Sequence, residues 1–449
     1  MSRRRRALWA LVVLACMALL LAPAAWNGFP LLQFDTGGYL APWYDHDLHI
    51  NRSVPYGLLL VAGQWSDFWP VLILQSALTI WVLALTLRAH GLGQRPLLFL
   101  GVTAVLCLVT TLPWLTAILL TDIFAGLAVL ALYLLLLRDE ALTRAERIGL
   151  TALLTVSSAT HSGTLAVLIL LLAAAGAMWL IDRTRIPLAR LARAALALAL
   201  GAAMVLAADL LVTGELAWTP GGPALSFGRM LQDGIVKRYL DDHCPDAGLK
   251  LCPYRATLPR DADDFFWGGG VFDKLGRFDG LNREMRHIAL ASLADYPGLQ
   301  ARSMITETAK QLTMVETGAG VVNWIWNTYD TIEHDAPVAV PAMKAARQQR
   351  AGISFTAINR LQVPVALTAM ALLPFVAAYA LRRKGFADLA ELNAAAALAV
   401  LANAAVFGVL ATAHNRYGAR VAWIAALAVL LTLVRTIKER APRLAVPKA

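Results

Sequence analysis

Residues 30–57, "PLLQFDTGGYLAPWYDHDLHINRSVPYG", concentrate titratable side chains directly after the first apolar run of the chain. Asp35 stands in the short sequence FDTGGYL, where Gly37 and Gly38 allow the backbone to turn tightly. A carboxylate in a loop beside a membrane can accept a proton from a substrate hydroxyl or amine. Asp35 or Thr36 could instead cap an interfacial helix. The local sequence leaves both interpretations open.

The same stretch contains candidate metal ligands and a candidate phosphate ligand. Carboxylates and imidazoles could bind a divalent metal, although D-H-D-x-H is not a recognised metal motif and a solvated loop would look the same. No cofactor is therefore certain. Arg52, shortly before Pro55 and Tyr56, could hold a phosphate or pair with a lipid headgroup. The weak metal candidates are Asp45, His46, Asp47 and His49.

Two further titratable side chains lie in or between apolar runs. Asp122, in AILLTDIFAG, falls inside the run 115–137, where an ionisable group is costly and by default suggests function. An internal pair with an arginine, or capping of a broken helix, would also explain it. His161, in SSATHSGT, could contact a phosphate or relay a proton. A histidine in a turn can equally be structural.

The sequence ATAHNRYGARVAW, near the last apolar run, combines arginine, histidine and tyrosine. Guanidinium groups bind phosphate or pyrophosphate well. Membrane anchoring is the alternative, and it explains a tyrosine better than it explains two arginines. Together with nearby basic residues, this pattern indicates an anionic ligand. The residues of the motif are His414, Arg416, Tyr417 and Arg420, and the nearby ones are Arg347, Arg350 and Arg360.

The elements that must position these residues are membrane helices. The chain has 449 residues, of which 58% are hydrophobic and only 16% are charged, against about 25% in a soluble domain. Apolar runs of about 20 residues recur, which is the length that crosses a bilayer. A β-barrel would show short alternating strands instead. We therefore expect an all-α polytopic membrane protein.

About ten transmembrane helices are predicted, and the apolar stretch 54–63 is too short to span and is expected at the interface. The first run follows four arginines and ends in APAA, like a signal peptide, but its length favours an uncleaved anchor. The predicted spans are 7–25, 68–87, 96–113, 115–137, 146–160, 162–181, 188–213, 359–381, 387–412 and 420–437.

The distribution of basic residues predicts the orientation. With the N-terminus in the cytoplasm, every short connection predicted to be inside is basic, as the positive-inside rule requires. This explains the net charge of +10 without nucleic-acid binding. Both termini are then cytoplasmic. The basic residues concerned are Arg88, Arg95, Arg138, Arg144, Arg147, Arg183, Arg185, Arg190, Arg193, Arg382, Arg383, Lys384, Arg435, Lys438, Arg440, Arg443 and Lys448.

The opposite, periplasmic side receives nearly all the unusual polar residues. Three regions are expected: an N-terminal transmembrane region 1–213 with the external loop 26–67, a mostly helical periplasmic loop domain 214–358, and a C-terminal transmembrane region 359–449. Cys244 and Cys252 lie in the periplasmic loop domain, where an oxidising compartment permits a disulfide.

These features resemble the GT-C membrane glycosyltransferases, which use polyprenyl-phosphate-linked sugars. The resemblance rests on Asp-x-x-x-Tyr from Asp35 to Tyr39, on Arg52 before Pro55-Tyr56, and on an Arg-Tyr pair near the last external turn. It implies that Asp35 deprotonates or aligns the acceptor and that Arg52, Arg416 and Arg420 hold the lipid phosphate. Thr36 replaces a second acidic residue common in the family, Ser53-Val54 separate Arg52 from the proline, and the large loop is not C-terminal. The resemblance thus defines neither a subfamily nor a metal requirement.

We therefore expect a glycosyltransferase of a bacterial inner membrane, acting on a lipid, glycan or protein acceptor at the periplasmic face among membrane lipids. Asp35 and Asp122 are the catalytic candidates. The alternatives are an envelope-polysaccharide polymerase or ligase, and a lipid or glycan transporter or assembly protein; a transporter should show pseudo-symmetry and charges at mid-membrane. An enzyme should bring Asp35, Asp122, His161 and Arg416 to one cavity. Candidate donor-phosphate ligands are Arg52, His161, His414, Arg416, Tyr417 and Arg420, and candidate acceptor or loop residues are Tyr39 and Tyr56.

Overall fold

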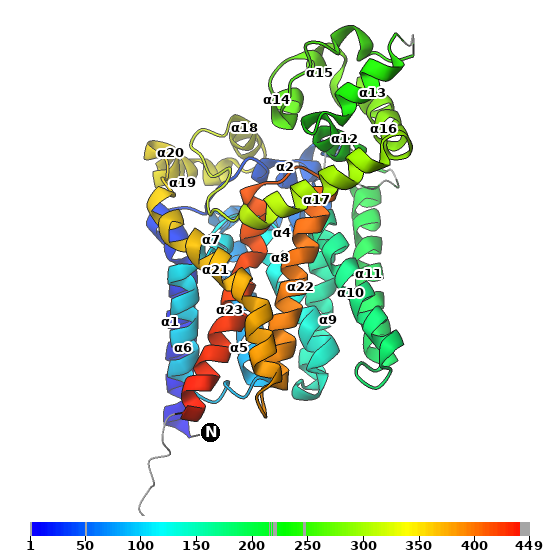
Figure 1. Cartoon of the computed structure of the whole chain (residues 1–449). Coiled ribbons are helices and arrows are strands. Elements are labelled where there is room, and N and C mark those ends of the chain that lie inside the picture. The colour runs from blue at the N-terminus through cyan, green and yellow to red at the C-terminus, as the bar shows by residue number, and fades with distance from the viewer. Residues whose placement is uncertain are drawn as a thin grey trace, which may run out of the picture.

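The computed structural model describes residues 2–49, 52–214, 216, 218, 222–245 and 248–440. Within these residues every regular element is a helix, and the β contact is a single isolated bridge (Figure 1). Seven helices are long and apolar enough to cross a membrane. They are α1 (Arg3–Asn27), α5 (Trp69–Ala89), α10 (Ser162–Ile181), α11 (Leu188–Thr213), α21 (Thr356–Leu381), α22 (Ala387–Leu410) and α23 (Asn415–Arg440). Arg443 and Lys448, assigned to a basic tail, lie outside the described residues.

Three shorter helices occupy the remaining predicted spans: α6 (Pro96–Val109), α8 (Asp122–Leu137) and α9 (Arg144–Thr160). The prediction of one continuous helix over 115–137 is wrong. Helix α7 (Leu112–Ala117) ends before α8 begins, because the backbone groups of Ala117 and Leu119 pair with Leu31 in the loop after α1. Leu31 N–H donates to the Ala117 carbonyl at 2.9 Å, and Leu119 N–H donates to the Leu31 carbonyl at 3.0 Å. These bonds satisfy backbone groups that a continuous helix would satisfy internally.

Helix α8 lies at the centre of the bundle, and its residues from Asp122 to Leu136 are all buried. A helix that is apolar on every side is stable only when neighbours cover it completely. By contrast, α1 buries one stripe, with Val12, Cys16 and Leu20 at four-residue spacing, and leaves its other faces exposed. A helix with such a lipid-facing surface belongs at the edge of a membrane bundle.

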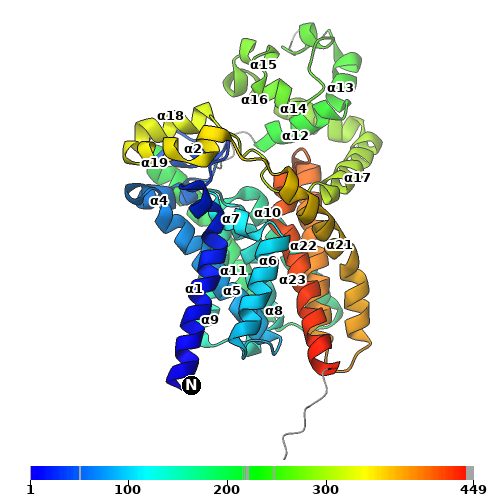
Figure 2. The same cartoon turned by 90° about the vertical axis from the view of Figure 1, so that its left-hand side faces the viewer.

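The two ends of the bundle differ in structure. At the end that carries the N-terminus, the helices are joined by short connections, whereas α2, α4 and α12 to α20 gather at the opposite end (Figures 1 and 2). The short connections hold arginine–carboxylate pairs, including Arg193 with Asp139 at 2.6 Å and Arg435 with Asp388 at 2.6 Å. The elements at the other end near the first helix are α2 (Thr36–Leu40), α3 (Pro42–Asp45), α4 (Val54–Gly63) and the 3₁₀ turn η1 (Gln64–Ser66), while η2 (Asp139–Ala141) lies in a short connection.

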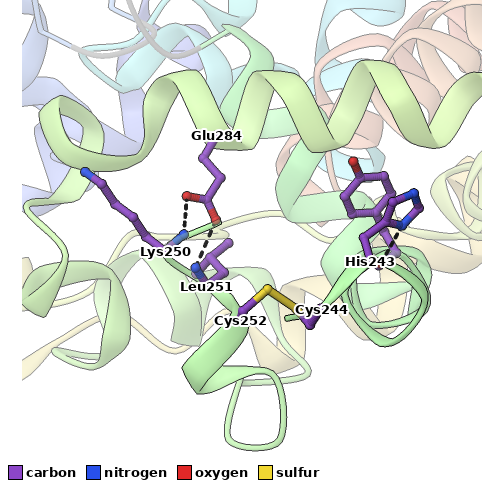
Figure 3. The surroundings of a disulfide bond; sticks show 7 residues. His243, Cys244, Lys250, Leu251, Cys252 and Glu284 are labelled. Atoms are coloured by element: carbon purple, nitrogen blue, oxygen red, sulfur yellow. Dashed lines mark hydrogen bonds between the residues drawn. A yellow bond between two sulfur atoms is a disulfide. The ribbon is translucent and has the colours of Figure 1, made fainter. Parts of the chain in front are cut away.

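The long segment between α11 and α21 has two parts. Residues 222–296 enclose their own hydrophobic core, which includes Phe227, Phe265 and Met285; we call this part the outer unit. Its two cysteines, Cys244 and Cys252, form a disulfide, and Glu284 accepts hydrogen bonds from the backbone N–H groups of residues 250 and 251 (Figure 3). Its elements are α12 (Gly222–Gln232), α13 (Ile235–His243), η3 (Cys252–Tyr254), α14 (Ala262–Trp267), α15 (Val271–Lys274) and α16 (Arg277–Asp295).

The second part of this segment returns to the main bundle. Helix α17 (Pro297–Thr313) crosses the end of α22 (Figure 1), and α18 (Trp326–Asp335) packs against α2. Residues Val321, Ile332 and Phe355 belong to the same hydrophobic core as the transmembrane helices. The remaining elements are η4 (Pro337–Ala339), α19 (Val340–Ala345) and α20 (Arg347–Ala351). This part therefore supports the loop that carries Asp35.

Candidate functional site

The loop that carries Asp35 is held on several sides by hydrogen bonds. Helix α1 ends at Gly28, which adopts the left-handed conformation with φ of 86° that glycine tolerates. The buried Gln348 side chain accepts from Leu32 N–H at 3.0 Å and donates to the Leu32 carbonyl at 2.7 Å. The Gln33 side chain accepts from Asp35 N–H at 2.7 Å. The carboxylate of Asp35 is thus carried on a fixed backbone.

Gly37 and Gly38 have a different role from the tight turn that the sequence suggested. Both lie inside α2, and a Cβ atom on Gly37 would stand 2.8 Å from the Cα atom of Thr328 on α18. Gly37 is needed for close packing of the two helices, whereas Gly38 lies against the side chain of Arg52. Asp35 precedes α2 but makes no side-chain capping bond, so its carboxylate is available for other partners.

Those partners are arginines from distant parts of the chain. Arg52 donates to one oxygen of Asp35, and Arg416 donates to the other. Arg416 also donates through Nε to Asp122 Oδ2 at 2.6 Å. Arg420 completes the group, with its Nη1 atom 4.0 Å from Asp122 Oδ1. We call these five residues the arginine–aspartate cluster.

Local structure explains why the cluster forms. Asp122 lies in the first turn of α8, at the helix N-terminus, which favours a carboxylate. It is therefore not eight residues inside a span, as the predicted continuous helix implied. Helix α23 begins at Asn415, earlier than predicted, so Arg416 and Arg420 are one helical turn apart and share a face. The isolated bridge between Leu31 and Ile118 brings the Asp35 loop beside the start of α8.

The electrostatic surroundings keep Asp35 ionised. Burial raises the pKa of the Asp35 carboxyl, but the charges of Arg52 and Arg416 lower that pKa by a larger amount. The net pKa therefore lies below the ordinary value of 3.8. Only 17% of the Asp35 side chain is exposed, and Arg420 is 1% exposed. Charges this deeply buried are tolerated because they are paired.

The pairing is incomplete, however. Three arginines and two aspartates leave a surplus of one positive charge. In the described part of the chain, Arg416 Nη2 and both Nη atoms of Arg420 are buried without a hydrogen-bond partner, as is Asp122 Oδ1. Buried polar atoms in native proteins nearly always have partners. Three unmatched guanidinium nitrogens suit an anion with several oxygens, such as a phosphate.

Aromatic and amide side chains fix the orientation of Arg420. Its Nε donates to Asn403 Oδ1 at 3.1 Å, and its guanidinium carbon lies 4.3 Å from the ring centre of Phe407. Tyr417 stacks on the same Phe407 ring with centroids 3.9 Å apart. Phe407 therefore holds both Arg420 and Tyr417 in place, and neither of them serves as an exposed membrane anchor.

A small pocket with a volume of about 40 Å³ opens beside the cluster. Asp122 and Arg416 line it, but Asp35 and His161 do not, so one cavity does not receive all four residues expected there. The rest of the wall is mainly apolar, which suits a ligand with an apolar tail next to its charged group. Its apolar side chains include Leu31, Trp114, Leu115, Ile118, Leu120, Val321 and Phe355.

His161 has a structural role at the edge of the cluster. It precedes α10, and its Nδ1 accepts from Gly163 N–H at 3.0 Å. Burial and the charges of Arg420 and Arg416 lower the pKa of its imidazole well below 6.5, so the ring is neutral. Its ring lies 6.0 Å from Phe407. His161 borders the cluster through these contacts but makes no direct bond to it.

The two tyrosines among the remaining predicted site residues are packed inside the protein. Tyr39 and Tyr56 are buried close together, with ring centroids 5.2 Å apart. Tyr39 bonds Thr121 at 3.4 Å and Tyr56 bonds Gln75 at 3.1 Å. Both therefore pack beneath the Asp35 loop and face no open space.

His414 is partly buried. Its Nε2 lies 2.7 Å from Thr412 Oγ1, and its backbone N–H donates to Gln311 Oε1 of α17 at 2.9 Å. Among the candidate metal ligands, His49 pairs with Asp45 at 2.6 Å, whereas His46 bonds the Val212 carbonyl. In the described ranges no group of three His, Cys, Asp or Glu side chains could hold a metal ion.

Sequence reasoning missed several residues that shape the site. Asn403 and Phe407 lie in the apolar run 387–412, where the buried amide of Asn403 was a signal of a polar contact inside the membrane. Gln348 and Thr328 carry no comparable signal, because their importance depends on tertiary contacts with the Asp35 loop.

Comparisons of the chain with family models, curated proteins and solved structures found no match. The function is therefore argued from the geometry of the arginine–aspartate cluster and its pocket.

Proposed function

We propose that this protein is a membrane glycosyltransferase of the GT-C type, which transfers a sugar from a polyprenyl-phosphate donor to an acceptor hydroxyl or amine. The observation that carries the proposal is the set of unmatched guanidinium nitrogens on Arg416 and Arg420, buried beside two carboxylates. A lipid-linked sugar phosphate supplies the oxygens that these nitrogens need, and its first isoprene unit would contact the apolar wall of the adjoining pocket.

The reaction follows from this placement. The acceptor oxygen attacks the anomeric carbon and forms the new glycosidic bond, while the bond between that carbon and the phosphate oxygen breaks. The lipid phosphate leaves with the electron pair, and Arg416 and Arg420 stabilise its growing negative charge. The proton of the acceptor passes to the carboxylate of Asp35.

Asp35 is a weak base while two arginines hold it, because they lower its pKa. The donor phosphate competes with Asp35 for Arg416, which loosens one of the two ion pairs. Removing a positive partner raises the pKa of a carboxyl. Donor binding therefore prepares Asp35 to accept the proton, and Asp122 keeps Arg416 in position through its Nε.

The membrane arrangement belongs to the same proposal. Ten helices cross a bacterial inner membrane, both termini are cytoplasmic, and the cluster faces the periplasm. The concentration of basic residues at the opposite end of the bundle supports this orientation. Cysteine labelling tests this orientation. A cysteine is introduced at Ser2 or at Asp45 in a variant that lacks Cys16 and Cys107. Intact spheroplasts with each variant are then treated with a membrane-impermeant maleimide. Only the Asp45 position should react.

The activity is tested with purified protein in proteoliposomes and a panel of polyprenyl-phosphate sugars. Release of free polyprenyl phosphate in the presence of an envelope extract supports the proposal. If no donor in the panel is consumed and none binds, the proposal fails. The same assay distinguishes a polymerase, which would consume lipid-linked oligosaccharides and no monosaccharide donors.

A further inference from the structure

A second cavity lies between the outer unit and the end of the membrane bundle. Four helices form its walls: α12 and α16 of the outer unit, α17, and the last turn of α22. Its volume of about 360 Å³ is within the range of about 300–1,000 Å³ typical of ligand pockets. The lining residues are Gly222, Pro223, Ser226, Arg229, Met230, Arg286, Ala289, Leu290, Leu293, Met304, Val409 and Leu410. None belongs to the arginine–aspartate cluster.

The cavity has a rigid wall. Arg229 is 1% exposed, and its guanidinium joins three helices. Its Nε donates to the Val409 carbonyl of α22 at 2.9 Å, its Nη2 donates to Gln300 of α17 at 2.8 Å, and its Nη1 pairs with Asp233 at 3.3 Å. Breaking such a buried charged network is costly. The outer unit is thus fixed to the bundle, and the cavity between them is preformed.

The surface of the cavity is mostly apolar, and its apolar surface continues outside. Leu290 is 58% exposed, Leu293 is 43% exposed, and Leu410, the last residue of α22, is 50% exposed. Because α22 is one of the helices long and apolar enough to cross a membrane, Leu410 lies at the end of a candidate span. The cavity therefore opens at the end of the apolar bundle.

One charged side chain on the cavity wall has no partner. Arg286 on α16 is exposed, and it forms no ion pair or hydrogen bond within the residues that the structure describes. The first turn of α12 lines the same cavity, and a helix N-terminus favours negative charge. Arg229 is already engaged, so Arg286 is the group available to an anionic headgroup.

We propose that this cavity binds an anionic phospholipid of the outer leaflet, with one acyl chain against Met230, Leu290 and Met304 and the phosphate at Arg286. The lipid completes the contact between the outer unit and the membrane. The proposal does not depend on the transferase activity, since its residues are separate from the candidate site.

The test uses the full chain in nanodiscs that contain phosphatidylglycerol with a photoactivatable diazirine in one acyl chain, followed by peptide mapping. We expect labelling at residues 286–293 and 409–410 in the wild-type protein. Ala289→Trp, which fills the cavity, and Leu290→Glu, which places a charge on its exposed wall, should each reduce this labelling about tenfold. Leu290→Glu alters a surface residue, so it remains informative if Ala289→Trp fails to fold.

Arg286→Glu tests the headgroup contact, with Arg283→Glu as its matched control, because Arg283 is exposed on the same helix and does not line the cavity. Arg286→Glu should weaken labelling by phosphatidylglycerol about tenfold and labelling by a zwitterionic phosphatidylcholine probe much less, whereas the control should change neither. Equal labelling in all variants would overturn the proposal. So would crosslinks from this cavity to a second copy of the chain in place of lipid.

Discussion

Asp35 and Arg416 form a salt bridge although 381 residues separate them in the chain. The bridge joins the loop after the first transmembrane helix to the first turn of the last one. Arg416 also contacts Asp122, which lies 294 residues before it. The candidate site therefore exists only when the loop after α1 and the first turn of α23 both lie beside the start of α8.

The effects of substituting Asp122 and Arg416 on the free energy of unfolding should be strongly coupled. Removing one partner of a buried ion pair costs about 3–5 kcal/mol, because the other charge is left uncompensated. Asp122→Asn and Arg416→Gln should each destabilise the protein markedly, and the double variant should lose less than the sum. Reversible unfolding of the four proteins in mixed micelles measures the coupling. Strict additivity would show that the pair is not a real interaction.

Arg420→Gln should weaken binding of the donor lipid. Both Nη atoms of Arg420 lack hydrogen-bond partners, so a phosphate would gain charged hydrogen bonds worth about 1.5–3 kcal/mol each. We expect polyprenyl phosphate to bind about 10–100-fold more weakly, as measured by displacement of a fluorescent analogue. Arg360→Gln, at an exposed position on α21, is the matched control and should bind normally. Equal affinities of the two variants would contradict the assignment.

The pH dependence of stability should reveal the ion pairs of Asp35. Its pKa lies below the ordinary value of 3.8, so its ion pairs stabilise the fold fully above that value. The contribution is lost as the pH falls through the lowered pKa. The difference in melting temperature between the wild type and Asp35→Asn should be constant from about pH 8 to about pH 5 and shrink only below about pH 4. A difference that shrinks already near neutral pH would mean that the carboxyl is not paired in this way.

Removing the disulfide should destabilise the outer unit and leave the transmembrane bundle intact. Cys244 and Cys252 are eight residues apart, and a disulfide that closes a loop of this size stabilises the folded state by about 2–3 kcal/mol. Replacing both by serine should speed proteolysis of the outer unit, measured by limited digestion, with no change at α1 to α9. Cys16→Ser, which alters a free buried cysteine, is the comparison. Unchanged digestion would show that the bridge does not support this unit.

The sequence predicted the membrane helices well, because long apolar runs and basic connections are local signals. It also placed Asp35 and Arg416 at the same end of the bundle through the charge of the connections. The break before Asp122 could not be predicted, because it depends on the bridge between Leu31 and Ile118, which is a tertiary contact. For the same reason Gly37 and Gly38 suggested a turn, whereas Gly37 packs closely against Thr328 and Gly38 lies against the Arg52 side chain.

The central claim is that the arginine–aspartate cluster catalyses sugar transfer. The rate at which polyprenyl phosphate is released from a lipid-linked sugar tests this claim most directly. The assay compares wild type, Asp35→Asn and Asp45→Asn in the same proteoliposomes. Asp45 lies in the same segment after α1 but pairs with His49, away from the cluster, and so is the matched control. We predict that Asp45→Asn retains the wild-type rate and that Asp35→Asn loses at least about 100-fold, the contribution of a general base. A folded Asp35→Asn protein with the wild-type rate would contradict the account.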